Sequence, residues 1–227
     1  KTNKPWKYIM KLLKELTEIT STSGNESKIR KFIVKEIKKY VNKVKVDKYG
    51  NIIAHQKGSG AKVMLAAHMD EIGLMVKNIG ANGNIYVSSI GGIEASALVG
   101  QRVQVGKKEI PGVITWAAIN DDEEMEEAPI IEDLLIITGL NKKELERRGV
   151  EPGSFIEFVQ KTQILGKKDI ICGKALDDRI GCYILLELAR KLQKGKGDIY
   201  YVFTVQEEIG LYGSKTSITS VDPDWAV

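Results

Sequence analysis

Apolar residues recur every three or four positions in two stretches near the amino terminus, with lysines on the intervening positions. The first stretch has its apolar residues at Ile9, Leu12, Leu13, Leu16 and Ile19. The second has them at Ile29, Phe32, Ile33 and Ile37. This period predicts two amphipathic helices, which we interpret as scaffold. Ser23 lies three residues before Glu26, a spacing that favours a capping box at the start of the second helix.

Short uncharged runs in the next part of the chain predict β-strands. Residues 44–46 and 52–54 flank a short turn that contains a glycine, a pattern typical of a hairpin. Residues 63–67 form an apolar run that predicts a buried strand of a parallel or mixed sheet. His68 would lie at the carboxyl end of that strand. His55, at the end of the hairpin, is expected to be a surface or strand residue rather than a ligand.

The pattern then changes twice. From residue 72 to about residue 165 the chain has short strands between glycine-rich turns, which predicts a small β-barrel or sandwich. Beyond it, a helical period predicts a helix with apolar positions at Ile180, Ile184, Leu185, Leu188 and Leu192. Residues 199–205 are the most β-prone run of the chain and predict a further strand.

These elements define the expected fold class, which is α/β. We expect a mixed, largely parallel sheet with helices on both faces, interrupted by an inserted small β-barrel. Residues 1–71 and 166–227 would form the two parts of a catalytic domain. Residues 72–165 would form the inserted barrel.

Candidate chemistry lies where predicted strands end and where a helix begins. His68 and Asp70 follow the first strand, Asp177 and Asp178 begin the late helix, and residues 207–208 are a Glu-Glu pair that follows the last strand. Ligands of open α/β sheets bind at the carboxyl ends of strands. A neutral imidazole is a good zinc or cobalt ligand, and Asp70 can accept the other ring N–H. Each cluster alone also fits a structural histidine or helix caps, but together they favour a metal site.

Composition narrows the function classes. The formal net charge is +4 over 227 residues and lysine is spread along the chain, so nucleic-acid binding is not supported. No apolar run approaches the roughly 20 residues that span a bilayer, and there is no signal-peptide core, so we expect no membrane association and a cytoplasmic location. Cys172 and Cys182 are the only cysteines and are expected to pack in the interior or on a helix, without a disulfide framework.

Three ordered motifs carry a family resemblance. They are Ala67-His68-Met69-Asp70-Glu71-Ile72-Gly73, Gly173-Lys174-Ala175-Leu176-Asp177-Asp178-Arg179 and Val205-Gln206-Glu207-Glu208-Ile209-Gly210. Together with residues 23–26 and 131–134, they make the chain resemble the tetrahedral, self-compartmentalising metalloaminopeptidases, relatives of the co-catalytic zinc exopeptidases. The resemblance spans nearly the whole chain.

The resemblance implies a two-metal aminopeptidase that hydrolyses amino-terminal residues from peptides through a water bridging two divalent ions, zinc or cobalt. It implies that Asp177 bridges both ions, that His68 binds one and Glu208 the other. Glu207 would be the general base and Asp70 would orient His68. It also implies a cis peptide bond between Asp177 and Asp178. The inserted barrel would make subunit contacts in a homo-oligomer, expected to be a dodecamer built from dimers.

Two features depart from the family pattern. The family places an aspartate shortly after the position of Val227 and a histidine later still as further metal ligands. We therefore expect a truncated chain that binds metal weakly, does not hydrolyse peptides by itself and aggregates through an exposed sheet edge. The acidic run from Asp121 to Glu127 predicts a solvated loop. A sharper alternative is that this run lines a mouth or chamber and favours basic peptide ends.

Two interpretations from other classes stay open. One is a non-catalytic subunit that keeps the fold, which would assemble but hydrolyse no aminoacyl anilide. The other is a glycoside hydrolase that uses two carboxylates and needs no metal. His68 and Asp70 argue against the second interpretation, because a glycosidase has no evident use for them.

Overall fold

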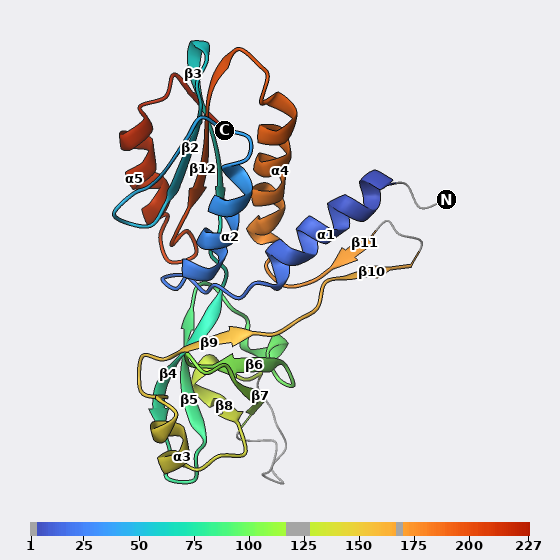
Figure 1. Ribbon diagram of the computed structural model, residues 1–227. Helices are drawn as coiled ribbons and strands as arrows, with labels where there is room; N and C mark the ends of the chain where they lie inside the picture. Colours follow the sequence, from blue (N-terminus) through green and yellow to red (C-terminus); the bar gives the residue numbers. More distant parts are fainter. Residues whose placement is uncertain (1–3, 117–127, 167–169) are drawn as a thin grey trace. The chain divides into compact units, whose positions relative to one another are not determined.

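The computed structural model describes residues 4–116, 128–166 and 170–227, with side chains from Met10 onward. The chain forms two compact units (Figure 1). The α/β unit contains Lys1–Glu71 and Lys161–Val227, and the barrel unit contains Ile72–Gln160. The sequence predicts an insert that runs to residue 165, but the structure ends it at Gln160. The reason is that β10 (Gln163–Leu165) pairs with β11 (Ile170–Cys172) in an antiparallel ribbon of the α/β unit.

The α/β unit is built on a five-stranded mixed sheet in the order β1-β2-β12-β3-β13. Its strands are β1 (Lys43–Val46), β2 (Ile52–Gln56), β3 (Ser59–His68), β12 (Gly197–Thr204) and β13 (Trp225–Ala226). The predicted hairpin is confirmed, since β1 pairs with β2 in antiparallel fashion. β12 is antiparallel to β2 but parallel to β3, and β3 is parallel to β13. Parallel pairing is thus confined to the part of the sheet that holds His68.

Helices cover both faces of this sheet, as predicted. They are α1 (Lys4–Glu18), α2 (Ser27–Ile37), α4 (Leu176–Leu192) and α5 (Tyr212–Val221). Side chains of a strand alternate between faces, so Tyr201 and Phe203 enter the core shared with α1, α2 and α4. Val202, between them, packs with Val221 of α5 on the other face. Two apolar cores therefore hold β12 rigidly between helices.

Two local predictions about helices need correction. The helix α4 exists, but Ile180 and Ile184 of its predicted apolar face are exposed, and the buried face is formed by Arg179, Cys182, Leu185, Leu186 and Ala189. At α2, no capping box forms. The residue before the helix is Glu26, and its carboxylate accepts hydrogen bonds from the N–H groups of Gly24 and Gln206 instead of capping the helix.

The barrel unit is a closed six-stranded barrel in the order β4-β5-β8-β7-β6-β9. Its strands are β4 (Gly73–Ile79), β5 (Ile85–Ile90), β6 (Arg102–Val105), β7 (Ile110–Trp116), β8 (Leu134–Ile137) and β9 (Phe155–Phe158). Short helices join them: η1 (Ala95–Ala97), η3 (Ile131–Asp133) and α3 (Lys142–Arg147). Every neighbouring pair is antiparallel, and the interior is filled by aliphatic side chains such as Leu74, Ile114 and Ile156. The predicted barrel is confirmed.

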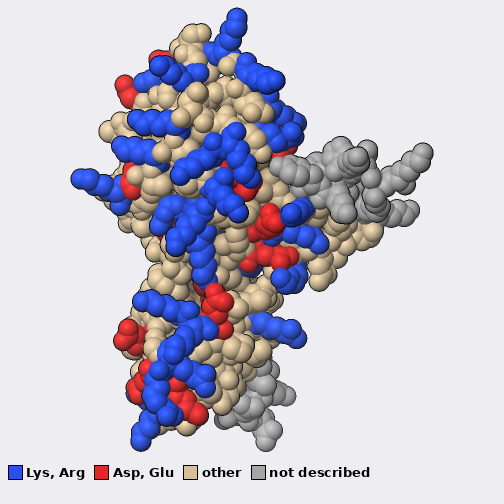
Figure 2. Space-filling model, viewed as in Figure 1, with Lys and Arg blue, Asp and Glu red and all other residues tan. Residues whose placement is uncertain are grey.

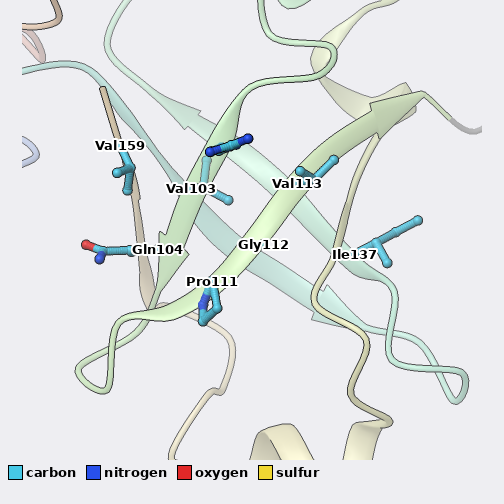
Figure 3. Close-up of a pocket in the computed structure, with 8 residues that line it drawn as sticks. Val103, Gln104, Pro111, Gly112, Val113, Ile137 and Val159 are labelled. Atoms are coloured by element: carbon cyan, nitrogen blue, oxygen red, sulfur yellow. The ribbon is translucent and has the colours of Figure 1, made fainter. Parts of the chain in front are cut away.

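The outer surface of the barrel carries an apolar groove of about 410 Å³ (Figure 3). Val113, Ile137 and Val159 line it and are each about 40–50% exposed, with Arg102 and Gln104 among the polar lining residues. Such contiguous apolar surface is typical of a contact with another molecule. The acidic run from Asp121 to Glu127 lies outside the described residues.

Lysine and arginine side chains are numerous on the face of the molecule drawn in Figure 2. Figure 2 shows lysines and arginines over the visible face, with carboxylates among them. Within the described part of the chain, no helix is both long enough and apolar enough to cross a membrane.

Candidate metal centre

The candidate site is built at the carboxyl ends of two parallel strands of the α/β unit. β3 ends at His68 and β12 ends at Thr204, and these two residues are paired in the register of the strands. The Met69 N–H donates to the Thr204 carbonyl at 2.9 Å, so the chains stay together just past the strands. The turns that follow therefore bring Asp70 and Glu207 to the same edge of the sheet, where ligands of open α/β sheets bind.

His68 lies at the centre of a group of carboxylates. Its Nδ1 lies 3.2 Å from the backbone carbonyl of Asp70 and 3.6 Å from an Asp70 carboxylate oxygen. Its Nε2 lies 3.0 Å from Asp177 Oδ1 and 3.9 Å from Glu207 Oε2. The two ring nitrogens thus face different partners, Asp70 on one side and the open centre on the other. The imidazole is held with Nε2 toward the centre.

Asp70 also organises the turn that carries the two glutamates. Its carboxylate is fully buried, and its two oxygens accept hydrogen bonds from the N–H groups of Glu207 and Glu208 at 3.1 and 3.2 Å. One buried side chain therefore touches both halves of the site. Removing Asp70 would disturb His68 and the glutamate pair together.

The pKa values follow from this crowding. Burial alone would lower the pKa of His68, but the carboxylates of Asp70, Asp177 and Glu207 outweigh burial and raise it to about 9. Burial would raise the pKa of Asp70, yet the contacts from His68 and the two glutamate N–H groups hold it below its ordinary value. Burial raises the pKa of Glu208, and its neighbouring carboxylates add to that rise. A cation would relieve this repulsion among the carboxylates.

The side chains of Asp177 and Asp178 have different partners. The peptide bond between Asp177 and Asp178 is cis, as predicted. The Asp177 side chain is 88% exposed and points its oxygen at His68. Asp178 Oδ1 instead accepts the N–H of Gly181 at 2.9 Å, as an N-cap does. A Cβ at Gly181 would lie 2.4 Å from the Asp178 carboxylate, so a larger residue there would displace that carboxylate.

The other histidine and the two cysteines contribute no ligand atom to the group of His68, Glu207 and Glu208. His55 lies in β2, where it contacts Asp198 at 2.7 Å and stacks on Tyr200, in line with its expected place in a strand. Cys182 is buried in α4 and its Sγ donates to the His68 carbonyl, whereas Cys172 is partly buried. Both cysteines are free thiols.

A buried ion cluster lies behind the site, and no pattern in the sequence predicted it. Glu71 is buried and its carboxylate contacts Lys174 Nζ at 2.7 Å and Arg179 Nη2 at 3.7 Å. Arg179 Nη1 also donates to the carbonyls of Leu16 and Ile19, at the end of α1. The three charged residues stand inside the motifs that carry the family resemblance, but adjacency in the sequence gives no sign that they meet. The cluster joins α1, the end of β3 and the start of α4.

The donor set fits a divalent cation. Among the described residues, His68, Glu207 and Glu208 offer one ligand atom each, and these atoms lie within 4.8 Å of one another. Imidazole nitrogen with carboxylate oxygen is the donor chemistry of catalytic zinc sites. Asp177 adds a further carboxylate on the open side of His68. The fold and the site thus define a class of protein, an α/β protein with a candidate metal centre at the strand ends of its mixed sheet.

The chain belongs to the M42 glutamyl aminopeptidase family, whose profile matches residues 50–227. The lysyl aminopeptidase of Pyrococcus furiosus is 37% identical over 94% of this chain and 63% of its own length. Among solved structures, a TET aminopeptidase from a marine sediment archaeon of the Thaumarchaeota has a TM-score of 0.90 and 32% identity, covering 96% of this chain and 65% of that one.

A third relative carries information about assembly. The Pyrococcus horikoshii TET1 peptidase, described as assembling into a tetrahedron or a large octahedral shell, has a TM-score of 0.87 and 33% identity. The match covers 96% of this chain and 67% of that one. The chain spans 62–64% of the length of the first curated relatives that it matches.

Proposed function

We propose that this chain carries the metal centre of an aminopeptidase that removes residues from the amino termini of peptides. The observation that supports it is the meeting of His68, Glu207 and Glu208 within 4.8 Å at the strand ends of an M42 family member. Asp177, 3.0 Å from the His68 ring, supplies the carboxylate that would bridge two ions. In this proposal His68 binds one ion, Glu208 binds the other and Asp177 binds both.

Two divalent cations, zinc or cobalt, would supply a Lewis acid that polarises the scissile carbonyl and lowers the pKa of water. The chain's own residues supply the proton transfers. Glu207 is the general base, which takes a proton from the attacking water and passes it to the leaving amine. Its side chain is 35% exposed, so substrate and water can reach it. Asp70 orients His68 through Nδ1, which leaves Nε2 free for the ion.

The assembly is part of the same proposal. We expect a homo-oligomer, a dodecamer built from dimers, in which the barrel unit contacts a second copy of this chain. The apolar groove of Val113, Ile137 and Val159 supports this expectation, as does the shell-forming relative. Peptide substrates and a cytoplasmic location complete the proposal. Light scattering of the purified chain tests the assembly, and a monomer at micromolar concentration would contradict it.

Metal binding tests the proposed roles most directly, because the two glutamates form a matched pair of neighbours. Glu208→Gln should lose metal, whereas Glu207→Gln should retain metal and lose any turnover. Zinc or cobalt titration calorimetry of the wild type and both variants measures this. A catalytic zinc usually has three protein ligands, so we expect the three proposed ligands, His68, Asp177 and Glu208, to hold two ions weakly. Metal loss in Glu207→Gln with residual turnover would exchange the two roles, and a wild type that binds no metal would contradict the proposal.

A substrate panel separates the aminopeptidase from the alternatives. Any hydrolysis of aminoacyl anilides measured with excess zinc or cobalt should be abolished by a chelator. Hydrolysis of a polysaccharide that survives the chelator would instead support a glycoside hydrolase. The contacts of the His68 ring with Asp177 and Glu207 disfavour that alternative, because a glycosidase that uses two carboxylates needs no imidazole. Full metal binding and assembly without turnover would support a non-catalytic subunit.

A further inference from the structure

Four successive backbone N–H groups just past β12 donate to side-chain oxygens from distant segments. The donors are, in chain order, Val205, Gln206, Glu207 and Glu208. The first donates to Asn51 Oδ1 at 3.0 Å, the second to Glu26 Oε1 at 3.3 Å, and the last two to Asp70. Asn51, Glu26 and Asp70 are all buried. We call these three side chains the amide cradle.

Glu26 holds the point where the backbone bends. Gln206 has a φ of +54°, a left-handed conformation that costs a residue with a Cβ roughly 1 kcal/mol or more. Glu26 Oε1 accepts the Gln206 N–H at this bend and also the Gly24 N–H at 2.7 Å. Burial raises the pKa of Glu26, with the Asp70 carboxylate adding to the rise. Burying a carboxylate costs free energy unless its oxygens accept hydrogen bonds. The N–H groups of Gly24 and Gln206 supply two such bonds to Glu26.

Asn51 fixes the other side of the turn. Its Oδ1 accepts the Val205 N–H, and its Nδ2 donates to the Gly213 carbonyl at 3.1 Å and to Asp47 Oδ2 at 2.7 Å. The backbone at Gly213 approaches so closely that an added Cβ would lie 2.5 Å from Asn51 Oδ1 and 2.3 Å from the Val205 carbonyl. Asn51 therefore ties the end of β12 to the first turn of α5.

We propose that Glu26 and Asn51 are positioning residues that set the direction of the Glu207 and Glu208 side chains. Neither residue is among those brought within reach of a common ion, so they would act through the backbone of the turn. Together with Asp70, they fix four consecutive backbone N–H groups. The side chains of Glu207 and Glu208 then project from a backbone that is held in one conformation. The effect on metal binding rests on the proposed function, whereas the effect on the turn does not.

Amide hydrogen exchange of the metal-free chain tests this inference without any need for activity. Glu26→Ala should speed exchange at Gln206 by about tenfold or more, since the N–H of Gln206 loses its charged acceptor. Exchange at Glu207 and Glu208 should rise as well, because the bend that aims their N–H groups at Asp70 is no longer held. The amides of Val202 and Phe203 in β12 should not change. Glu26→Gln should stay near the wild-type rates, because its amide carbonyl still accepts both N–H groups. Asn51→Ala should act in the same selective way at Val205.

The matched control is Glu157→Ala, which removes a buried carboxylate from β9 of the barrel unit. This variant should leave exchange at residues 205–208 unchanged. If Glu26→Ala does not fold, Glu26→Asp replaces it, because its shorter carboxylate withdraws from the Gln206 N–H and should give the same selective loss. Equal exchange at residues 206–208 in the wild type and Glu26→Ala, or a rise that also covers β12, would overturn the proposal.

Cobalt titration followed by visible absorption gives the second readout. Glu26→Ala should weaken cobalt binding by about tenfold or more, in the range known for residues that hold metal ligands in place, and Glu26→Gln should restore it. Selective loss of amide protection with unchanged cobalt affinity would overturn the positioning role. A wild type that binds no cobalt would contradict the proposed function instead, and the exchange experiment would then decide this inference by itself.

Discussion

Buried polar side chains are concentrated in the α/β unit, whereas the barrel unit buries aliphatic side chains almost throughout. Of the buried polar residues in the described part of the chain, only Glu157 belongs to the barrel. The others include Ser21, Thr22, Glu26, Asn51, Asp70, Glu71 and Arg179. The barrel core instead consists of leucine, isoleucine, valine and alanine. The two units come from one chain but place different groups in their interiors.

This difference shows which unit holds the candidate metal ligands in place. An aliphatic core needs little more than apolar residues of the right volume, and its stabilisation scales with the area removed from water. A buried carboxylate such as Asp70 or Glu71 is costly unless its oxygens are hydrogen-bonded. In the α/β unit such buried carboxylates lie next to the strand ends, where their oxygens are hydrogen-bonded. These contacts hold His68, Glu207 and Glu208 in place. The barrel carries no comparable cluster among its described residues and is expected to serve assembly.

The largest effect is expected from breaking the ion cluster of the α/β unit. Glu71→Ala leaves Lys174 and Arg179 buried without their carboxylate, which should lower the free energy of unfolding of that unit by about 3–5 kcal/mol. Lys161→Ala is the control, because it removes an exposed contact with Glu18 and should cost less than about 1 kcal/mol. Urea-dependent amide exchange measures each unit separately. Similar losses in the two variants would contradict the prediction.

A somewhat smaller effect is expected from a cavity in the barrel. Leu74→Ala removes a fully buried side chain from β4 and should destabilise the barrel unit by about 3 kcal/mol. Amide exchange in β4 to β9 should report the loss, while cobalt binding at the α/β unit should not change. A loss of cobalt affinity in Leu74→Ala would contradict the expectation that a cavity in the barrel unit leaves the metal site of the α/β unit unchanged.

The pH dependence is expected to come from the crowded site of the α/β unit. Carboxylates outweigh burial and raise the pKa of His68 to about 9, above the unfolded value near 6.5. In metal-free protein this stabilises the fold fully below about pH 6.5, and the contribution is lost as the pH rises through about 9. Urea unfolding at several pH values in this range, after chelation, measures it. His68→Gln should flatten the trend, and a wild type with constant stability across the window would refute it.

The smallest effect is expected on the exposed face of α4. Ile184 is 48% exposed, so Ile184→Ser should change the free energy of unfolding by no more than about 0.5 kcal/mol. Leu186→Ala, two positions away and buried, should cost about 2–5 kcal/mol in the same helix. Thermal unfolding of the two variants compares them. Equal losses would mean that Ile184 is covered in solution by another molecule.

The sequence by itself determined the elements and the motifs. Helical and alternating periods depend on neighbouring residues, so they located α1, α2, α4, the hairpin and the barrel. The positions of His68 and the Glu207–Glu208 pair just past two strands predicted that they meet at one edge of the sheet, since strand ends of one sheet edge lie close in space. The cis bond after Asp177 followed from the family resemblance rather than from any local pattern.

Only the tertiary structure decided which groups meet across the chain. Arg179 is buried in α4 while Ile180 is exposed, because Glu71 and the carbonyls at the end of α1 bind the guanidinium there. Glu26 faces the Gln206 turn instead of capping α2, since the N–H groups past β12 need an acceptor that no local residue supplies. A periodic pattern carries the direction of a side chain relative to its own helix or strand. It does not predict which residue of a distant segment that side chain will contact.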